Sequence, residues 1–293
     1  MEAEIMEKGW ESTQVVVNGL SLHVVEAGPA EGPLLILLHG FPEFWWGWRH
    51  QIAPLAESGY HVLAPDLRGY NLSDAPQQIS SYILDILVTD VIALADHYKA
   101  ERFYLVGHDW GGIVAWGVAA NHANRLERLV VMDAPHPDLW TEDLLKHPTQ
   151  ALRSTYVALF QLPWLPEQVL GALDFAALRS MVEASARQDA FKPGEIERYA
   201  KAWAQTGSLT AMLNYYRALR KRKKPDLPAR ILCPTLVLWG EKDSFLEHHV
   251  AKASLDLWSN GQLFIVKNAT HWLHLEEPAV VNSKIIEFFG RIN

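Results

Sequence analysis

Short runs of consecutive apolar residues recur along the chain, separated by longer stretches in which apolar residues return at helical spacing. Continuous apolar runs are typical of strands that are buried on both faces of a sheet. The strand-like runs lie within 33–40, 60–70, 102–109, 126–135, 234–243 and 262–271, and the helical ones within 82–98, 111–123 and 277–293. This alternation predicts an α/β fold with a mostly parallel sheet that helices cover on both sides.

The beginning of the chain departs from this alternation. In residues 13–28 two runs of alternating apolar and polar residues flank the dipeptide Asn18-Gly19. Both residues of this dipeptide tolerate positive φ, which a two-residue hairpin turn requires. We therefore expect an antiparallel hairpin at one edge of the sheet.

The middle of the chain departs from the alternation as well. Between residues 137 and 230 the strand-like runs disappear, and helical stretches broken by prolines replace them. The sequence thus predicts a core domain made of residues 1–136 and 231–293. Residues 137–230 are expected to form a helical lid that covers the ends of the strands.

Composition and charge narrow the choice of partners. The formal net charge of −8 does not favour binding to nucleic acid or to an anionic membrane surface. The N-terminal residues do not resemble a signal peptide, and no apolar run approaches the length of a membrane helix. The single cysteine cannot form an internal disulfide. These features predict a cytoplasmic protein, and they leave a monomer and a homodimer equally open.

Residues suited to catalysis follow four of the predicted strands. They lie in the segments HGFP (39–42), GHDWGG (107–112), GEKD (240–243) and NATHW (268–272). Ligands of doubly wound sheets bind beyond the carboxyl ends of the strands, so these segments are expected to converge. A nucleophile, an acid and a histidine in this order form the triad of one large class of hydrolases. We therefore assign Asp109, Asp243 and His271 to these three roles.

Asp109 stands where that class of hydrolases carries serine in the frame Gly-x-Ser-x-Gly. A carboxylate suits attack at a saturated carbon that bears a strained or good leaving group, which produces an ester. Water activated by a histidine can then hydrolyse this ester. Two alternatives stay open: Asp109 could be a helix N-cap, and Asp133 competes with Asp243 for the acid role.

The chain resembles the epoxide hydrolases of the α/β-hydrolase fold. The segments HGFPEFWWGWRHQ, DLRGYNLSD, GHDWGG and YYR carry this resemblance, which covers nearly the whole chain, lid included. It implies an eight-stranded, mostly parallel sheet with an inserted helical lid. It also implies that an epoxide is opened by Asp109 and released as a vicinal diol.

The resemblance also assigns roles around the three central residues. Backbone N–H groups of Phe41 and Trp110 would stabilise the oxyanion that forms on Asp109, and a cis peptide before Pro42 fits that loop. The phenols of Tyr156 and Tyr216 would bind and protonate the epoxide oxygen. Consecutive helix residues point about 100° apart, so only one of the pair Tyr215 and Tyr216 is expected to face that oxygen. The residues expected to contact substrate are Trp110, Tyr215, Pro42 and Trp272.

Two other classes of function compete with this interpretation. A haloalkane or haloacid dehalogenase shares the aspartate step, but such enzymes usually carry asparagine in place of Phe41 or arginine in place of Trp110. A non-catalytic hydrolase-like binding protein would not require the complete set of nucleophile, acid and base. We expect no metal and no cofactor, and an apolar or aryl epoxide together with water as the reactants. His108 and His274 fit the position of the base less well than His271.

Overall fold

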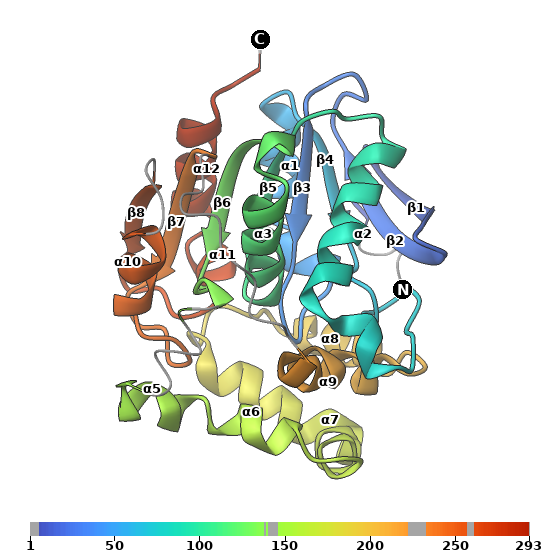
Figure 1. The fold of residues 1–293 in the computed structure, drawn as a ribbon, viewed down its shortest axis with the longest axis vertical. Helices are drawn as coiled ribbons and strands as arrows, with labels where there is room; N and C mark the ends of the chain where they lie inside the picture. Colours follow the sequence, from blue (N-terminus) through green and yellow to red (C-terminus); the bar gives the residue numbers. More distant parts are fainter. Residues whose placement is uncertain (1–5, 138, 140–145, 222–232, 257–260, 293) are drawn as a thin grey trace.

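A single eight-stranded sheet runs through the molecule, and its order is β1-β2-β4-β3-β5-β6-β7-β8 (Figure 1). The computed structural model describes residues 6–137, 139, 146–221, 233–256 and 261–292. Strands β3 to β8 run parallel to one another, whereas β1 and β2 add the antiparallel edge, with β2 antiparallel to β4. The strands are β1 (Trp10–Val17), β2 (Leu20–Ala27), β3 (Leu34–Leu38), β4 (His61–Pro65), β5 (Phe103–His108), β6 (Leu126–Met132), β7 (Thr235–Gly240) and β8 (Gly261–Val266).

The predicted hairpin forms the β1–β2 edge. Val17 pairs with Leu20 across the turn, and both turn residues take positive φ, 50° at Asn18 and 74° at Gly19. This is the backbone geometry that a two-residue hairpin loop needs in order to match the twist of its strands. The sequence therefore predicted the mostly parallel sheet and its antiparallel edge correctly.

Helices cover both faces of the sheet, as the alternation of strands and helices predicted. Helices α2 and α3 pack together against β1 and β5, whereas α1 and α12 pack together behind the sheet (Figure 1). Helix α10 packs on β7 and β8, and α11 precedes α12. The bounds are α1 (Ile52–Glu57), α2 (Leu84–His97), α3 (Trp110–Asn121), α10 (His249–Asp256), α11 (Leu273–Glu276) and α12 (Pro278–Phe289), with 3-10 helices η2 (Trp45–Trp48), η3 (Ile79–Tyr82) and η4 (Ala123–Arg125).

A layer of helices lies across the carboxyl ends of the parallel strands (Figure 1). These helices fall within the segment for which the sequence predicts a lid. The boundary predicted between residues 230 and 231 lies outside the described residues, as do residues 138 and 140–145 close to the predicted start. The helices are α5 (Pro148–Arg153), α6 (Thr155–Phe160), α7 (Leu165–Ser185), α8 (Glu195–Trp203), α9 (Ser208–Ala218) and η5 (Leu219–Lys221).

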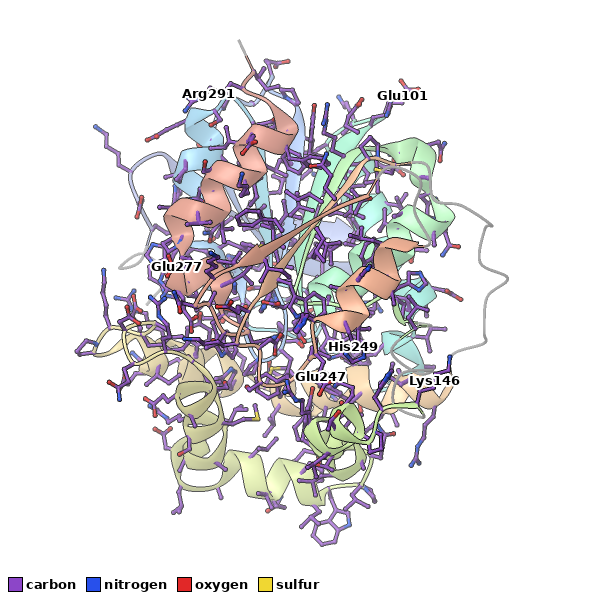
Figure 2. All side chains as sticks on the ribbon, turned by 90° about the vertical axis from the view of Figure 1, so that its left-hand side faces the viewer. Glu101, Lys146, Glu247, His249, Glu277 and Arg291 are labelled. Carbon is purple, nitrogen blue, oxygen red and sulfur yellow. The ribbon has the colours of Figure 1, made fainter. Side chains whose placement is uncertain are left out.

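Large apolar side chains fill the space between the sheet and its helices. Figure 2 shows these side chains in the interior, with charged residues such as Glu101 and Arg291 at the periphery. Strands β3 and β5 are buried almost throughout, as the continuous apolar runs predicted. Many of the tryptophans belong to this core: Trp45, Trp48, Trp116, Trp203, Trp239 and Trp272 are all less than 2% exposed.

Candidate active site

The turn between β5 and α3 places Asp109 at the carboxyl edge of the sheet. Asp109 has φ of 49° and ψ of −119°, a backbone conformation that residues other than glycine rarely adopt. The turn is tight because a Cβ on Gly111 would lie 2.1 Å from the Leu38 carbonyl oxygen. A Cβ on Gly107 would lie 2.4 Å from the Gly111 oxygen. Glycine at both positions therefore lets α3 begin directly against β3, with the half-buried Asp109 at the bend.

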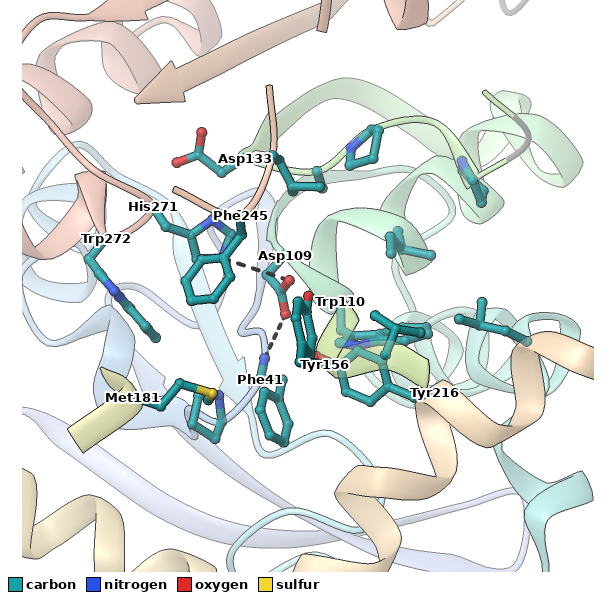
Figure 3. A pocket seen from close by; sticks show the side chains of 18 residues that line it. Phe41, Asp109, Trp110, Asp133, Tyr156, Met181, Tyr216, Phe245, His271 and Trp272 are labelled. Carbon is teal, nitrogen blue, oxygen red and sulfur yellow. Dashed lines mark hydrogen bonds and ion pairs between the residues drawn. The ribbon is translucent and has the colours of Figure 1, made fainter. Parts of the chain in front are cut away.

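The two oxygens of the Asp109 carboxylate have different surroundings (Figure 3). Oδ1 accepts a hydrogen bond of 2.7 Å from the backbone N–H of Phe41. Oδ2 lies 3.7 Å from Nε2 of His271. The side chain makes no capping hydrogen bond to α3, so the alternative role of a helix N-cap is not observed. The carboxylate is thus fixed through one oxygen, and its other oxygen faces the histidine.

His271 is held by Asp243 and not by Asp133. Its Nδ1 lies 2.8 Å from Oδ2 of Asp243, whose Oδ1 accepts hydrogen bonds from the backbone N–H groups of Phe245 and Leu246. Burial disfavours the imidazolium, but the carboxylates of Asp243, Asp109 and Asp133 outweigh burial and raise the pKa of His271 to about 10. His271 is therefore an imidazolium at neutral pH while all of these charges are in place.

A largely apolar cavity opens above Asp109, between the sheet and the lid helices (Figure 3). Tyr156 from α6 and Tyr216 from α9 line it, with ring centroids 5.9 Å apart in an edge-to-face arrangement. Burial raises the pKa of both phenols well above the ordinary value, and the Asp109 carboxylate adds to this shift. Both tyrosines therefore keep their protons at neutral pH. The remaining wall includes the side chains of Phe41, Pro42, Trp110, Ile113, Met181, Phe245 and Trp272.

Of the four residues predicted to contact substrate, three line this cavity and one does not. Pro42, Trp110 and Trp272 belong to its wall, and the Phe41–Pro42 peptide is cis. The prediction for Tyr215 was wrong, because its hydroxyl donates a 2.8 Å hydrogen bond to the Arg68 carbonyl behind the cavity wall. The side chains of consecutive residues on α9 point in different directions, so Tyr216 alone of this pair reaches the cavity.

The model of the α/β hydrolase fold family matches residues 33–278. A protein of Bacillus subtilis named AB hydrolase superfamily protein YfhM is 45% identical over 94% of this chain and 96% of its own length. Human epoxide hydrolase 4 is 38% identical over 92% of this chain and 76% of its own. The crystal structure of a Bacillus megaterium epoxide hydrolase with an inhibitor superimposes with a TM-score of 0.87 at 29% identity, covering 94% of this chain and 99% of that one.

The chain belongs to the epoxide hydrolases of the α/β-hydrolase fold. The family model covers most of the chain, and the relatives match both the sheet and the lid segment. The fold and family expected from the sequence are thereby confirmed. None of the described helices of this epoxide hydrolase is long and apolar enough to span a membrane.

Behind the cavity, this epoxide hydrolase contains a buried polar network that the sequence did not predict. The Glu43 carboxylate lies 3.1 Å from Nδ1 of His108 and 3.2 Å from Nε2 of His274, and it accepts a hydrogen bond from Tyr199. Nε2 of His108 lies 2.9 Å from the His271 carbonyl oxygen, which can only accept. His108 therefore donates to the backbone of the candidate base. The only sequence signal was the position of Glu43 directly after HGFP, since burial cannot be read from one residue.

The charge of Glu43 is stabilised by its neighbours. Burial alone would raise the pKa of Glu43, but the rings of His274 and His108 outweigh burial and hold it well below its usual range. Burial lowers the pKa of His274 to about 4, so this ring is neutral and donates through Nε2.

Potential metal-ligand atoms lie within 4.8 Å of one another in Glu43–His108–His274 and in His108–Asp133–His271. Because hydrogen bonds already account for the first group, the absence of a metal stays our prediction.

Neutralising Glu43 should destabilise the enzyme. Glu43→Gln removes the charge that three donors share and turns an amide N–H₂ group toward one of these donors. We expect the free energy of unfolding to fall by about 2–4 kcal/mol, measured by urea denaturation. Glu287→Gln is the control, because its exposed pair with Lys284 should contribute less than about 0.5 kcal/mol. Equal unfolding midpoints for the two variants would show that the network is not structural.

Proposed function

We propose that this epoxide hydrolase converts apolar or aryl epoxides into vicinal diols through a covalent ester on Asp109. The observation that carries the proposal is the asymmetry of the Asp109 carboxylate. Oδ1 is occupied by the Phe41 N–H, whereas Oδ2 faces the cavity and His271. The names of the relatives, human epoxide hydrolase 4 among them, support the class of substrate.

In the first step, Oδ2 of Asp109 attacks a ring carbon of the epoxide. The C–O bond of the ring breaks as the ester bond forms, and negative charge develops on the epoxide oxygen. Tyr156 and Tyr216 are the proton donors on the lid side of the cavity. One phenol transfers its proton to the alkoxide, which becomes the first hydroxyl group of the product. The pair of phenols thus performs the task that a halide-binding residue would perform in a dehalogenase.

Formation of the ester also prepares the base. The Asp109 ester is neutral, so one of the charges that raise the pKa of His271 is lost. The new phenolate and the His271 imidazolium then carry opposite charges in one cavity. Transfer of a proton between them restores the phenol and leaves His271 neutral. His271 therefore loses its proton and becomes able to act as a base only after the ester has formed.

In the second step, neutral His271 takes a proton from water, and the resulting hydroxide attacks Cγ of the Asp109 ester. The tetrahedral intermediate carries its negative charge on Oδ1, where the Phe41 N–H already points. We assign the Trp110 N–H, at the first residue of α3, as the second donor. Collapse of the intermediate breaks the bond between Cγ and Oδ2, and the departing alkoxide takes the proton from the His271 imidazolium to become the second hydroxyl group of the diol. The new carboxyl group of Asp109 gives its proton to His271, which restores the carboxylate and the imidazolium. Asp243 holds His271 in the orientation that this step needs.

The apolar wall determines which epoxides fit. Near the reacting atoms the cavity presents mainly aromatic and aliphatic side chains, Trp110, Phe245 and Trp272 among them. Such a surface accommodates aryl or alkyl substituents better than charged ones. The substrate class is therefore the uncharged, apolar epoxide.

A choice between leaving groups tests the function directly. Purified protein should convert styrene oxide to its diol, and it should release no halide from a haloalkane of similar size, because the cavity offers phenols that protonate an oxygen. Diol formation is followed by chromatography and halide by a colorimetric assay. Halide release without diol formation would identify the enzyme as a dehalogenase.

Removal of the base should trap the ester. His271→Gln should still be alkylated but should lose turnover, so intact-mass spectrometry should show an increase equal to the mass of one substrate. In the wild-type enzyme, the single-turnover rate of ester hydrolysis should rise with pH until His271 has lost its proton. No adduct in a variant that still binds substrate would contradict the covalent route.

The lid phenols should act on the first step alone. Tyr216→Phe and Tyr156→Phe should each slow alkylation by about 10- to 100-fold, because one donor remains in each variant. Stopped-flow fluorescence separates this step from ester hydrolysis. Tyr215→Phe is the matched control: it removes the adjacent phenol outside the cavity and should leave the alkylation rate unchanged. Equal slowing of both steps in the Tyr216 variant would exclude its role as an acid.

A further inference from the structure

Helix α5 of the lid contacts the turn that carries Asp243. The side chain of Gln150 in this helix is polar but fully buried. Its Nε2 group donates a 2.9 Å hydrogen bond to the Phe245 carbonyl and a 3.0 Å bond to Ser154 Oγ, and its Oε1 accepts a 2.9 Å bond from the Glu247 N–H. Both N–H donors and the oxygen of the amide are therefore in use. Through its two backbone contacts, this amide joins the lid to the turn.

One peptide group links Gln150 to the Asp243 carboxylate. The Phe245 carbonyl and the Leu246 N–H belong to the same planar peptide group and point to opposite sides of it. Gln150 donates to the carbonyl oxygen, and the N–H donates a 3.0 Å hydrogen bond to Oδ1 of Asp243. Hydrogen bonds in such a chain polarise and strengthen one another. The lid therefore fixes the plane of this peptide group, and the peptide group in turn orients the carboxylate.

Two further contacts hold the same turn between the lid and the candidate base. Arg153, the last residue of α5, donates a 2.8 Å hydrogen bond to the backbone carbonyl of Asp243. The ring of Phe245 packs edge-to-face on His271, with centroids 5.2 Å apart, and on Tyr156 of α6 at 5.9 Å (Figure 3). The turn is therefore in contact with α5, with α6 and with the imidazole ring, so a change in α5 can reach the base.

We propose that Gln150 is a positioning residue for ester hydrolysis, which holds the Leu246 peptide group and through it orients Asp243 toward His271. The inference rests on the proposed function, because the pair of Asp243 and His271 acts in the second step of that mechanism. The attack on the epoxide does not use the base, so Gln150 matters for ester hydrolysis and not for alkylation. The lid segment that carries the Tyr156 phenol thus also fixes the acid of the following step.

Removal of the Gln150 amide tests the proposal. Gln150→Leu keeps a side chain of similar size, and we expect it to slow ester hydrolysis by about 10- to 100-fold, because a small displacement of a catalytic group is costly. The alkylation rate, measured in the same stopped-flow experiment, should stay unchanged. Gln150→Glu, which keeps an acceptor for the Glu247 N–H but loses the donor, is the second variant in case the first unfolds. Gln205→Leu is the matched control, since this lid glutamine donates to the Lys201 carbonyl one turn earlier.

The proton NMR signal of the His271 Nδ1–H group reports positioning without any substrate. The 2.8 Å contact with Asp243 should give a signal far downfield, which is assigned by its loss in His271→Gln. In Gln150→Leu this signal should move upfield or vanish through exchange with water, whereas Gln205→Leu should leave it in place. An unchanged signal in Gln150→Leu, or equal slowing of alkylation and hydrolysis, would overturn the proposal. If the wild-type enzyme forms no diol from styrene oxide, the proposed function fails, and the NMR signal still decides whether Gln150 positions the imidazole.

Discussion

The close contact between the start of α3 and the end of β3 is the constraint on which the site depends. The Leu38 carbonyl oxygen occupies the space that a Cβ on Gly111 would need. The chain must therefore turn sharply between β5 and α3, and Asp109 takes a positive φ that costs about 1–3 kcal/mol. Burial of α3 against the sheet offsets this cost, since most residues of the helix are inaccessible to solvent. A change that moved α3 outward would withdraw the Asp109 carboxylate from the Phe41 N–H.

Around this turn, buried charges are balanced in two separate groups. On the cavity side, His271 stands among the carboxyl groups of Asp109, Asp243 and Asp133, and behind it Glu43 is balanced by His108 and His274. His108 links the two groups through the His271 carbonyl. An uncompensated charge at this depth would cost several kcal/mol, so each group must hold its protons in a fixed arrangement. The ester that we propose on Asp109 would change the charge of the cavity-side group alone and would leave the Glu43 group unchanged.

The sequence predicted those features that depend on local pattern. Buried strands, the Asn18-Gly19 hairpin and the Gly-x-Asp-x-Gly turn each follow from a few adjacent residues, and the structure contains all three. It did not predict features that depend on long-range packing. Tyr215 was expected at the substrate because its spacing alone does not tell which face of α9 meets the cavity. Glu43 was missed because its partners His108 and His274 come from segments that only the folded sheet brings together.

Phe41 connects the lid to the core of the molecule. Its backbone N–H fixes Oδ1 of Asp109, while its ring packs edge-to-face on Tyr216, with centroids 5.3 Å apart, and contacts Phe160 at 5.7 Å. One residue thus carries the N–H that we propose for the oxyanion and contacts the phenol that we propose for the epoxide oxygen. An asparagine at this position would keep the N–H but would lose the aromatic contact with both lid helices. The phenylalanine therefore does more than leave out a halide ligand, because its ring joins the loop after β3 to the lid helices α6 and α9.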